Sequence, residues 1–164
     1  MRKPDAQFNK VTDISPQFFI DNNLTGIILD IDNTVIGLDG KRLEGVNEWI
    51  KSLQESNIKL CIASNSKNRE KISKFASKAD MPFFLFSCKP LKRGLKKALK
   101  ELDMKSENVA EIGDQLFTDV WGAKKMRMFS ILTKPFTPER NCITRFKRKI
   151  EQRRLDKINK VSKW

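Results

Sequence analysis

The stretch Gly26-Ile-Ile-Leu-Asp-Ile-Asp-Asn-Thr34 decides the fold of this chain. Its apolar run is short and β-branched, which predicts a buried strand and not a helix. Asp30 and Asp32 follow one residue apart, and because side chains alternate along an extended backbone, we expect both on one face. Neighbouring carboxylates repel and require a cation or a proton. This strand end is therefore predicted to carry chemistry.

Four further apolar runs predict strands, and segments with helical periodicity separate them. The five strands are expected at Gly26–Asp30, Ile58–Ala63, Pro82–Phe86, Val109–Ile112 and Met128–Leu132. The helices are expected at Gly45–Ser56, Asn68–Ala79, Leu91–Leu102 and Thr118–Met126, with Thr118 as a cap. This alternation predicts an α/β fold, a Rossmann-like three-layer α/β/α sandwich with a mainly parallel central sheet. Ligands of such sheets bind beyond the carboxyl ends of the strands.

We expect three segments along the chain. Residues 1–25 form a lead-in with a short helix that Ser15 caps, and residues 26–136 form the catalytic domain. Residues 137–164 form a basic C-terminal helix, capped by Thr137, that packs on the domain or extends from it.

Composition excludes several kinds of chemistry. The 164 residues contain no histidine, which removes every mechanism that needs an imidazole base. The three cysteines show no CxxC spacing, so a zinc site is not expected and a reducing compartment fits. Catalysis is left to carboxylates, lysine or a metal.

The chain is strongly basic, with a formal net charge of +13. Residues 140–164 alone contain ten Lys or Arg and two Asp or Glu. Such a charge predicts an anionic partner: nucleic acid, anionic lipid or a phosphorylated substrate.

Polar groups also follow the other predicted strands. Ser64 follows the second strand, Lys89 follows the third, and Asp114 and Asp119 follow the fourth. Because parallel strands bring their carboxyl ends to one edge of a sheet, we expect these groups to meet there.

This set, in this order, resembles the haloacid dehalogenase superfamily of phosphatases. The first family motif, DxDxT, is matched by Asp30, Asp32 and Thr34. The second motif is a Ser or Thr, the third a Lys, and the fourth GDxxxxD. These three are matched by Ser64, by Lys89, and by Gly113, Asp114 and Asp119.

The resemblance implies roles for the residues that handle phosphate. Asp30 attacks phosphorus and forms an aspartyl-phosphate, and Asp32 protonates the leaving oxygen and then deprotonates water. Ser64, its neighbour Asn65, and Lys89 bind the phosphoryl oxygens. Lys89 also offsets the charge of the carboxylates.

The resemblance further implies Mg²⁺ as the cofactor, a cation that prefers oxygen ligands. It is expected on the side chains of Asp30 and Asp114 and on the backbone carbonyl of Asp32. Asp119 supports it directly or through water.

The spacing leaves no room for the cap domain that many family members insert. Thirty-one residues separate Asp32 from Ser64 and 24 separate Ser64 from Lys89, and one helix and one strand fill each gap. An open site is expected to act on a phosphate carried by a protein, a nucleic-acid end or a lipid head group.

Finer features resemble subfamily IIIA, the capless members, and within it the phosphatidylglycerophosphate phosphatases of bacteria and mitochondria. They are LDxDNT in the first motif, then Ser64-Asn65, Lys89-Pro90 and Gly113–Asp119. This implies dephosphorylation of phosphatidylglycerophosphate, an anionic phospholipid, to phosphatidylglycerol. The basic helix would then hold a cytoplasmic protein peripherally on the inner face of the membrane, with Phe18, Phe19, Phe146 and Trp164 in the interface.

Alternatives stay open at this point. The last helix can equally pack its apolar stripe on the domain and leave its charges in water. The same site fits a phosphatase of nucleic-acid ends or phosphoproteins. A different class is a basic protein that binds nucleic acid or the ribosome, although few aromatic residues interleave with the basic ones for base stacking.

Overall fold

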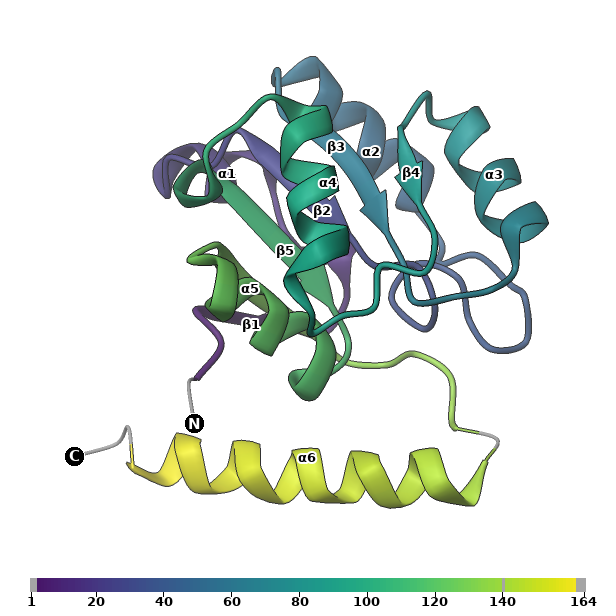
Figure 1. Ribbon diagram of the computed structural model, residues 1–164, viewed down its shortest axis with the longest axis vertical. Coiled ribbons are helices and arrows are strands. Elements are labelled where there is room, and N and C mark those ends of the chain that lie inside the picture. The colour runs from purple at the N-terminus through teal and green to yellow at the C-terminus, as the bar shows by residue number, and fades with distance from the viewer. Residues whose placement is uncertain (1–2, 140, 162–164) are drawn as a thin grey trace.

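A computed structural model describes residues 3–139 and 141–161, with side chains described as far as residue 158. Its centre is one sheet of six parallel strands in the order β1-β6-β5-β2-β3-β4 (Figure 1). The strands are β1 (Ala6–Phe8), β2 (Gly26–Leu29), β3 (Lys59–Ala63), β4 (Phe83–Phe84), β5 (Val109–Gly113) and β6 (Phe129–Thr133). The α/β fold with a parallel central sheet is confirmed.

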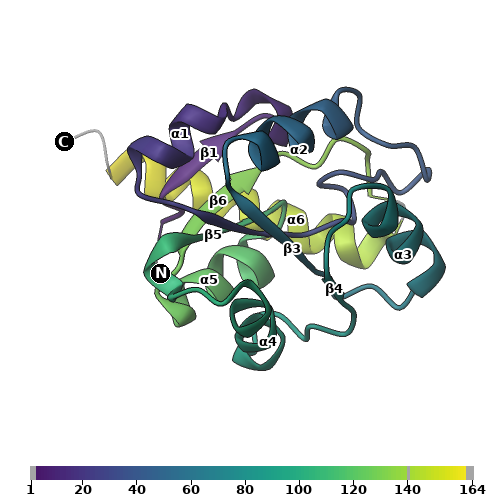
Figure 2. The same cartoon turned by 90° about the horizontal axis from the view of Figure 1, so that it is seen from above.

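Helices cover both faces of this sheet (Figure 2). One face packs against α1 (Pro16–Asp21), α2 (Val46–Glu55) and α3 (Arg69–Lys78). The other packs against α4 (Lys92–Leu102) and α5 (Trp121–Met126). The remaining elements are η1 (Val11–Asp13), η2 (Ser106–Asn108), the π-helical η3 (Leu116–Val120) and α6 (Cys142–Val161).

Alternating side chains of the central strand supply both layers of the core. Ile27 and Leu29 lie in the cluster with α1, α2 and α3, whereas Ile28 between them lies in the cluster with α4 and α5. All three side chains are fully buried. A strand buried on both faces reads as a continuous apolar run, which is why β2 was recognisable from sequence.

Both edges of the sheet differ from the expectation. β1 was not predicted; it pairs with β6, with Ala6 opposite Ile131, so the lead-in contributes a strand as well as α1. β4 has two residues where five were expected, because only Phe83 and Phe84 pair with β3. An edge strand has only one neighbouring strand and needs few apolar residues, so its hydrophobic sequence pattern is weak.

Two predicted helix caps are wrong. The last helix begins at Cys142 and not at Thr137, whose backbone N–H and hydroxyl both donate to the Asn33 side chain. Thr118 lies inside η3, and α5 begins only at Trp121. At Thr137 a tertiary contact outweighs the local capping signal.

The interface role predicted for Phe19 is wrong, because Phe19 is fully buried. Phe18 is partly buried and packs edge-on against Phe8, Phe19 and Phe129, and its interface role stays a prediction. Trp164 lies outside the described residues, whereas Phe146 is exposed.

α6 lies outside the two helical layers and crosses the edge of the sheet where β5 and β6 end (Figures 1 and 2). Its Leu155 packs on Leu116, Val120 and Leu132. Within residues 3–139 and 141–161, no cap domain is inserted after β2 or β3. Over the same part of the chain, no helix has the length and apolar character to cross a membrane.

Candidate active site

The site lies where β2 and β5 end side by side. The sheet continues from β2 through β3 in one direction and from β5 through β6 in the other, so the strand order reverses between β2 and β5, where sheets of this kind bind ligands. Asp30 follows β2, and its backbone N–H donates to the carbonyl of Ile112 on β5 (2.9 Å). Asp30, Asp114 and Asp119 are buried, and one carboxylate oxygen of each lies within 4.8 Å of the others.

Gly113 lets Asp119 reach this cluster. A Cβ at Gly113 would lie 2.3 Å from the Asp119 carboxylate, closer than any real contact. The Asp119 carboxylate also accepts a hydrogen bond from the Gln115 backbone N–H (3.0 Å). The GDxxxxD spacing thus returns the second aspartate across one π-helical turn onto the glycine.

Lys89 is the buried cation of the site. Its ammonium lies 2.9 Å from Asp30, 3.1 Å from Glu111 and 2.7 Å from Asp119, and its side chain has no exposed surface. An ammonium has three N–H donors, and three carboxylates surround this one. This arrangement favours the predicted charge-offsetting role over phosphate binding by Lys89, which stays a prediction.

Asn65 holds the loop that carries Lys89. Its side-chain oxygen accepts from the Ser87 hydroxyl (2.8 Å) and the Lys89 N–H (2.9 Å), and its NH₂ donates to the Lys89 carbonyl (3.0 Å). Ser87 N–H donates to the Ser64 carbonyl (3.1 Å). A Cβ at Gly94 would lie 2.4 Å from the Ser87 carbonyl oxygen, so glycine lets α4 pack on this loop. The Asn65 side chain therefore positions this loop, and its expected contact with phosphate stays a prediction.

Ser64 is buried beside this loop. Its hydroxyl oxygen accepts from the Ser66 backbone N–H (3.1 Å), which leaves the hydroxyl proton available to a phosphoryl oxygen. Thr34 is also buried, and its N–H donates to the Ile31 carbonyl (3.2 Å), in keeping with a residue of the turn after β2.

Burial dominates the electrostatics of the carboxylates. It raises the pKa of Asp30 to about 7 and that of Glu111 to about 8, although the positive charge of Lys89 opposes both shifts. Burial likewise raises the pKa of Asp114, against the pull of Arg148. Burial alone would lower the pKa of Lys89, but the carboxylates outweigh it and raise that pKa well above its usual value.

Asp32 has a different setting from Asp30. Its carboxylate pairs with the ammonium of Lys71 on α3, and both side chains are partly exposed. Asp32 is absent from the carboxylate cluster of the described residues. The two aspartates of the first motif thus contact different partners, one in the buried cluster and one near solvent.

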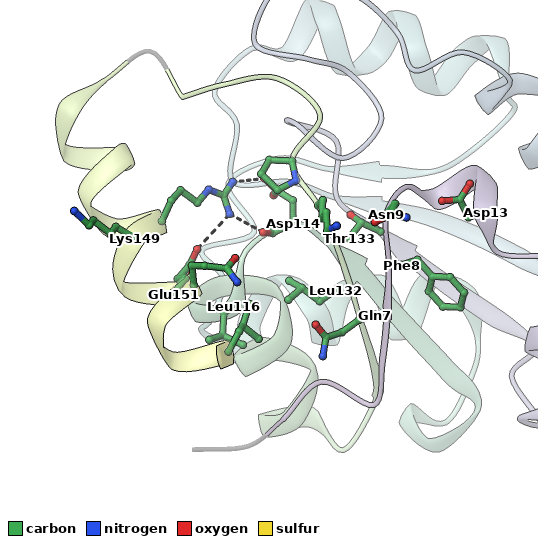
Figure 3. A pocket seen from close by; sticks show the side chains of 15 residues that line it. Gln7, Phe8, Asn9, Asp13, Asp114, Leu116, Leu132, Thr133, Lys149 and Glu151 are labelled. Atoms are coloured by element: carbon green, nitrogen blue, oxygen red, sulfur yellow. Dashed lines mark hydrogen bonds and ion pairs between the residues drawn. The ribbon is translucent and has the colours of Figure 1, made fainter. Parts of the chain in front are cut away.

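Arg148 of α6 closes the far side of the site. Its guanidinium pairs with the Asp114 carboxylate, donates to the Asp114 carbonyl (2.6 Å), and pairs with Glu139 (2.9 Å) and Glu151 (3.3 Å). A cavity of about 710 Å³ lies beside it, between α6 and the ends of β1 and β6. Figure 3 shows Asp114 at one wall of this cavity, with Leu116 and Leu132 below.

Three residues of the site were not found from sequence: Glu111, Lys71 and Arg148. Glu111 gave one signal, because it is a single acid inside the otherwise apolar strand β5. Lys71 and Arg148 gave none, since each is one of many basic residues on a helix.

The residues present fit a hard divalent cation. Three buried carboxylates converge, and oxygen ligands of this type suit Mg²⁺ and related ions. One Asp114 oxygen, Oδ1, is buried without any hydrogen-bond partner and so is available to a ligand. Asp30 and Asp114 would be the main side-chain ligands, with Asp119 beside them.

The chain is similar in sequence to known hydrolases. The family model of haloacid dehalogenase-like hydrolases matches residues 31–133. The chain is 32% identical over 158 residues to the Bacillus subtilis (strain 168) protein named "Probable phosphatase YqeG", covering 96% of this chain and 91% of that protein.

Solved structures share the fold. An uncharacterised protein from Listeria monocytogenes serotype 4b gives a TM-score of 0.57 at 17% identity, over 72% of this chain and 85% of that one. The cobalt-bound deoxy-D-mannose-octulosonate 8-phosphate phosphatase of Haemophilus influenzae gives 0.53 at 15% identity, over 69% and 80%. The chain thus belongs to the haloacid dehalogenase-like hydrolase family, and it is a member without an inserted cap.

Proposed function

We propose that the protein is a Mg²⁺-dependent phosphomonoester hydrolase whose substrate is phosphatidylglycerophosphate. The observation that carries the hydrolase activity is the buried cluster of Asp30, Asp114 and Asp119 beyond the ends of β2 and β5, with Lys89 paired to Asp30 and Asp119. Phosphoryl transfer depends mainly on positioning and on neutralising charge, and this cluster supplies both.

Asp30 is the nucleophile in this proposal. Its carboxylate oxygen forms a bond to phosphorus as the bond between phosphorus and the leaving oxygen breaks. Lys89 fixes its orientation from 2.9 Å, and the Ser64 hydroxyl donates to a phosphoryl oxygen. A bound divalent cation neutralises phosphoryl charge and favours the ionised form of Asp30, whose pKa burial raises to about 7.

Asp32 is the acid and base. It donates a proton to the leaving oxygen, then takes a proton from the water that attacks phosphorus and releases Asp30 and inorganic phosphate. Its partial exposure suits this role, because the proton has a route to solvent. Lys71 holds the Asp32 carboxylate by an ion pair and is thus a positioning residue.

The lipid substrate is supported by three features of the chain. Its motifs resemble those of phosphatidylglycerophosphate phosphatases over nearly the whole length. The described residues include no inserted cap to enclose a small metabolite. The basic α6 lies across the edge that holds the site, where it favours an anionic lipid.

The test is phosphate release from phosphatidylglycerophosphate in detergent micelles, with Mg²⁺ or with a chelator. We expect Asp30→Asn and chelation each to abolish release. The matched control is Asp103→Asn, an exposed aspartate after α4 that adopts a positive φ which asparagine tolerates.

Parallel assays separate the substrate from the mechanism. A 5′-phosphorylated oligonucleotide and a phosphopeptide are offered under the same conditions. If the oligonucleotide or the phosphopeptide is hydrolysed faster than phosphatidylglycerophosphate, the lipid substrate is refuted but the phosphatase activity is not. Full activity of Asp30→Asn on every substrate refutes the mechanism.

A further inference from the structure

Exposed apolar side chains gather around the site. Five large hydrophobic residues are exposed in the described part of the chain, and four of them lie on two segments that border the site. Phe86 and Leu91 (58% and 62% exposed) flank Lys89 in the loop after β4. Ile143 and Phe146 (73% and 66%) lie in the first turns of α6, which also carries Arg148.

The two segments lie at the same edge of the sheet. The loop after β4 and the first half of α6 both lie beyond the carboxyl ends of the strands in Figures 1 and 2. Each is anchored to the site from inside, the loop by Asn65 and α6 by the pair of Arg148 with Asp114. We call Phe86, Leu91, Ile143 and Phe146 the apolar rim.

Part of the apolar rim has a backbone conformation that costs free energy. Phe86 and Cys88 adopt positive φ angles of 49° and 53°, which bulky residues rarely adopt. Ser87 between them is tied to Ser64 and Asn65. A phenylalanine that is held in a strained conformation and exposed to water indicates a functional surface.

Exposed basic residues accompany the apolar rim. The starts of α3 and α4 and the helix α6 lie at the same edge of the sheet (Figure 1), and they carry Lys67, Arg69, Lys92, Arg93, Arg145, Lys149 and Arg153. On α6, Ile143 and Phe146 are three residues apart and so share a face, while Arg148, Glu151 and Leu155 face the domain. Separate apolar side chains among cations are typical of surfaces that enter the interface of an anionic bilayer.

We propose that the apolar rim docks this edge of the protein on an anionic phospholipid bilayer, so that the site opens toward the lipid head groups. The inference rests on the proposed function in its choice of partner, and it shares Phe146 with the interface residues expected from sequence. Nucleic acid is the weaker occupant, because Leu91 and Ile143 are aliphatic and cannot stack on bases.

Vesicle co-sedimentation tests the surface without any phosphomonoester present. We expect binding to vesicles of equal parts phosphatidylcholine and phosphatidylglycerol, weaker binding in high salt, and none to phosphatidylcholine alone. Phe86→Ser with Leu91→Ser, or Ile143→Ser with Phe146→Ser, should each weaken binding by roughly tenfold or more. The control is Ile20→Ser, the same kind of apolar-to-serine change at an exposed residue (50%) on α1. This variant should bind vesicles as the parent does.

Two native cysteines give a second measurement on the unaltered surface. Cys88 lies within the loop and Cys142 begins α6, and both are exposed, whereas Cys61 is buried. An environment-sensitive fluorophore on either thiol should shift to the blue when anionic vesicles are added.

The possible outcomes distinguish failure of the docking surface from failure of the proposed hydrolase activity. No binding to anionic vesicles, equal binding by all variants, or no shift at either label overturns the docking surface, even if the lipid is hydrolysed in micelles. Binding to a single-stranded oligonucleotide in place of vesicles also overturns it. If the protein binds vesicles but releases no phosphate, the proposed hydrolase function is refuted and the docking surface is retained.

Discussion

Replacing Lys89 by methionine tests the central electrostatic argument. The side chain keeps its approximate length and loses its charge, so three buried carboxylates lose their counter-ion at distances of 2.7 to 3.1 Å. Removing one partner of a buried ion pair costs about 3–5 kcal/mol. Since a domain of this kind is stable by about 5–15 kcal/mol, the variant should fold but be marginal at pH 8.

The pH dependence of this loss follows from linkage. Burial already raises the pKa of Asp30 to about 7 and that of Glu111 to about 8, and loss of Lys89 raises both further. An acid whose pKa is higher in the folded state takes up a proton on folding, so its ionised form destabilises the protein as pH rises. The deficit of Lys89→Met should therefore be largest near pH 8 and small near pH 5.

The assay is urea unfolding with a chelator present, at several pH values. A double variant supplies the control: adding Glu111→Gln to Lys89→Met removes one of the orphaned charges and should restore part of the stability at pH 8. A deficit below about 1 kcal/mol at pH 8 would refute the reasoning, given the expected cost of an orphaned buried charge. A deficit that is the same at pH 5 and pH 8 would refute the linkage.

Three further changes have definite expected outcomes. Glu111→Gln alone should gain stability over the parent as pH rises from 5 to 9, by on the order of 1 kcal/mol or more, in thermal unfolding. Arg148→Ala removes the contacts of α6 with Asp114, so hydrogen exchange should speed up in α6 and stay unchanged in the central strands. Asn65→Ala removes three hydrogen bonds from the Lys89 loop and should lower kcat more than it raises KM, with a stability loss of about 1–3 kcal/mol.

The central strands and the motif residues were accessible from sequence for a physical reason. A strand buried on both faces is a continuous apolar run, and parallel strands all end at one edge. Asp30, Asp114 and Asp119 therefore had to converge once their strands were recognised, although they are up to 89 positions apart. The placement needed no knowledge of side-chain contacts.

Features that depend on contacts with residues far away in the sequence could not be predicted from it. β1 exists because Ala6–Phe8 finds the free edge of β6, and Thr137 is held by Asn33 and not by a helix start. Arg148 resembles every other basic residue of its helix until the helix is placed against Asp114. Local patterns predict local structure, and these contacts join residues more than 30 positions apart.

Glu111 adds a fourth carboxylate to the buried charge of the site. Lys89 pairs with three of the carboxylates, those of Asp30, Glu111 and Asp119, and Arg148 pairs with the fourth, that of Asp114. Arg148 also pairs with Glu139 and Glu151, so protons, or a divalent cation on the free oxygen of Asp114, would supply the remaining positive charge. Burial raises the pKa values of Asp30 and Glu111 and so favours their protonated forms. Protons and metal are thus alternative ways to hold the same carboxylates together. Under the proposed mechanism a bound divalent cation would favour the ionised form of Asp30, which attacks phosphorus, so the burial that makes the site costly would also make its reactivity depend on the cation.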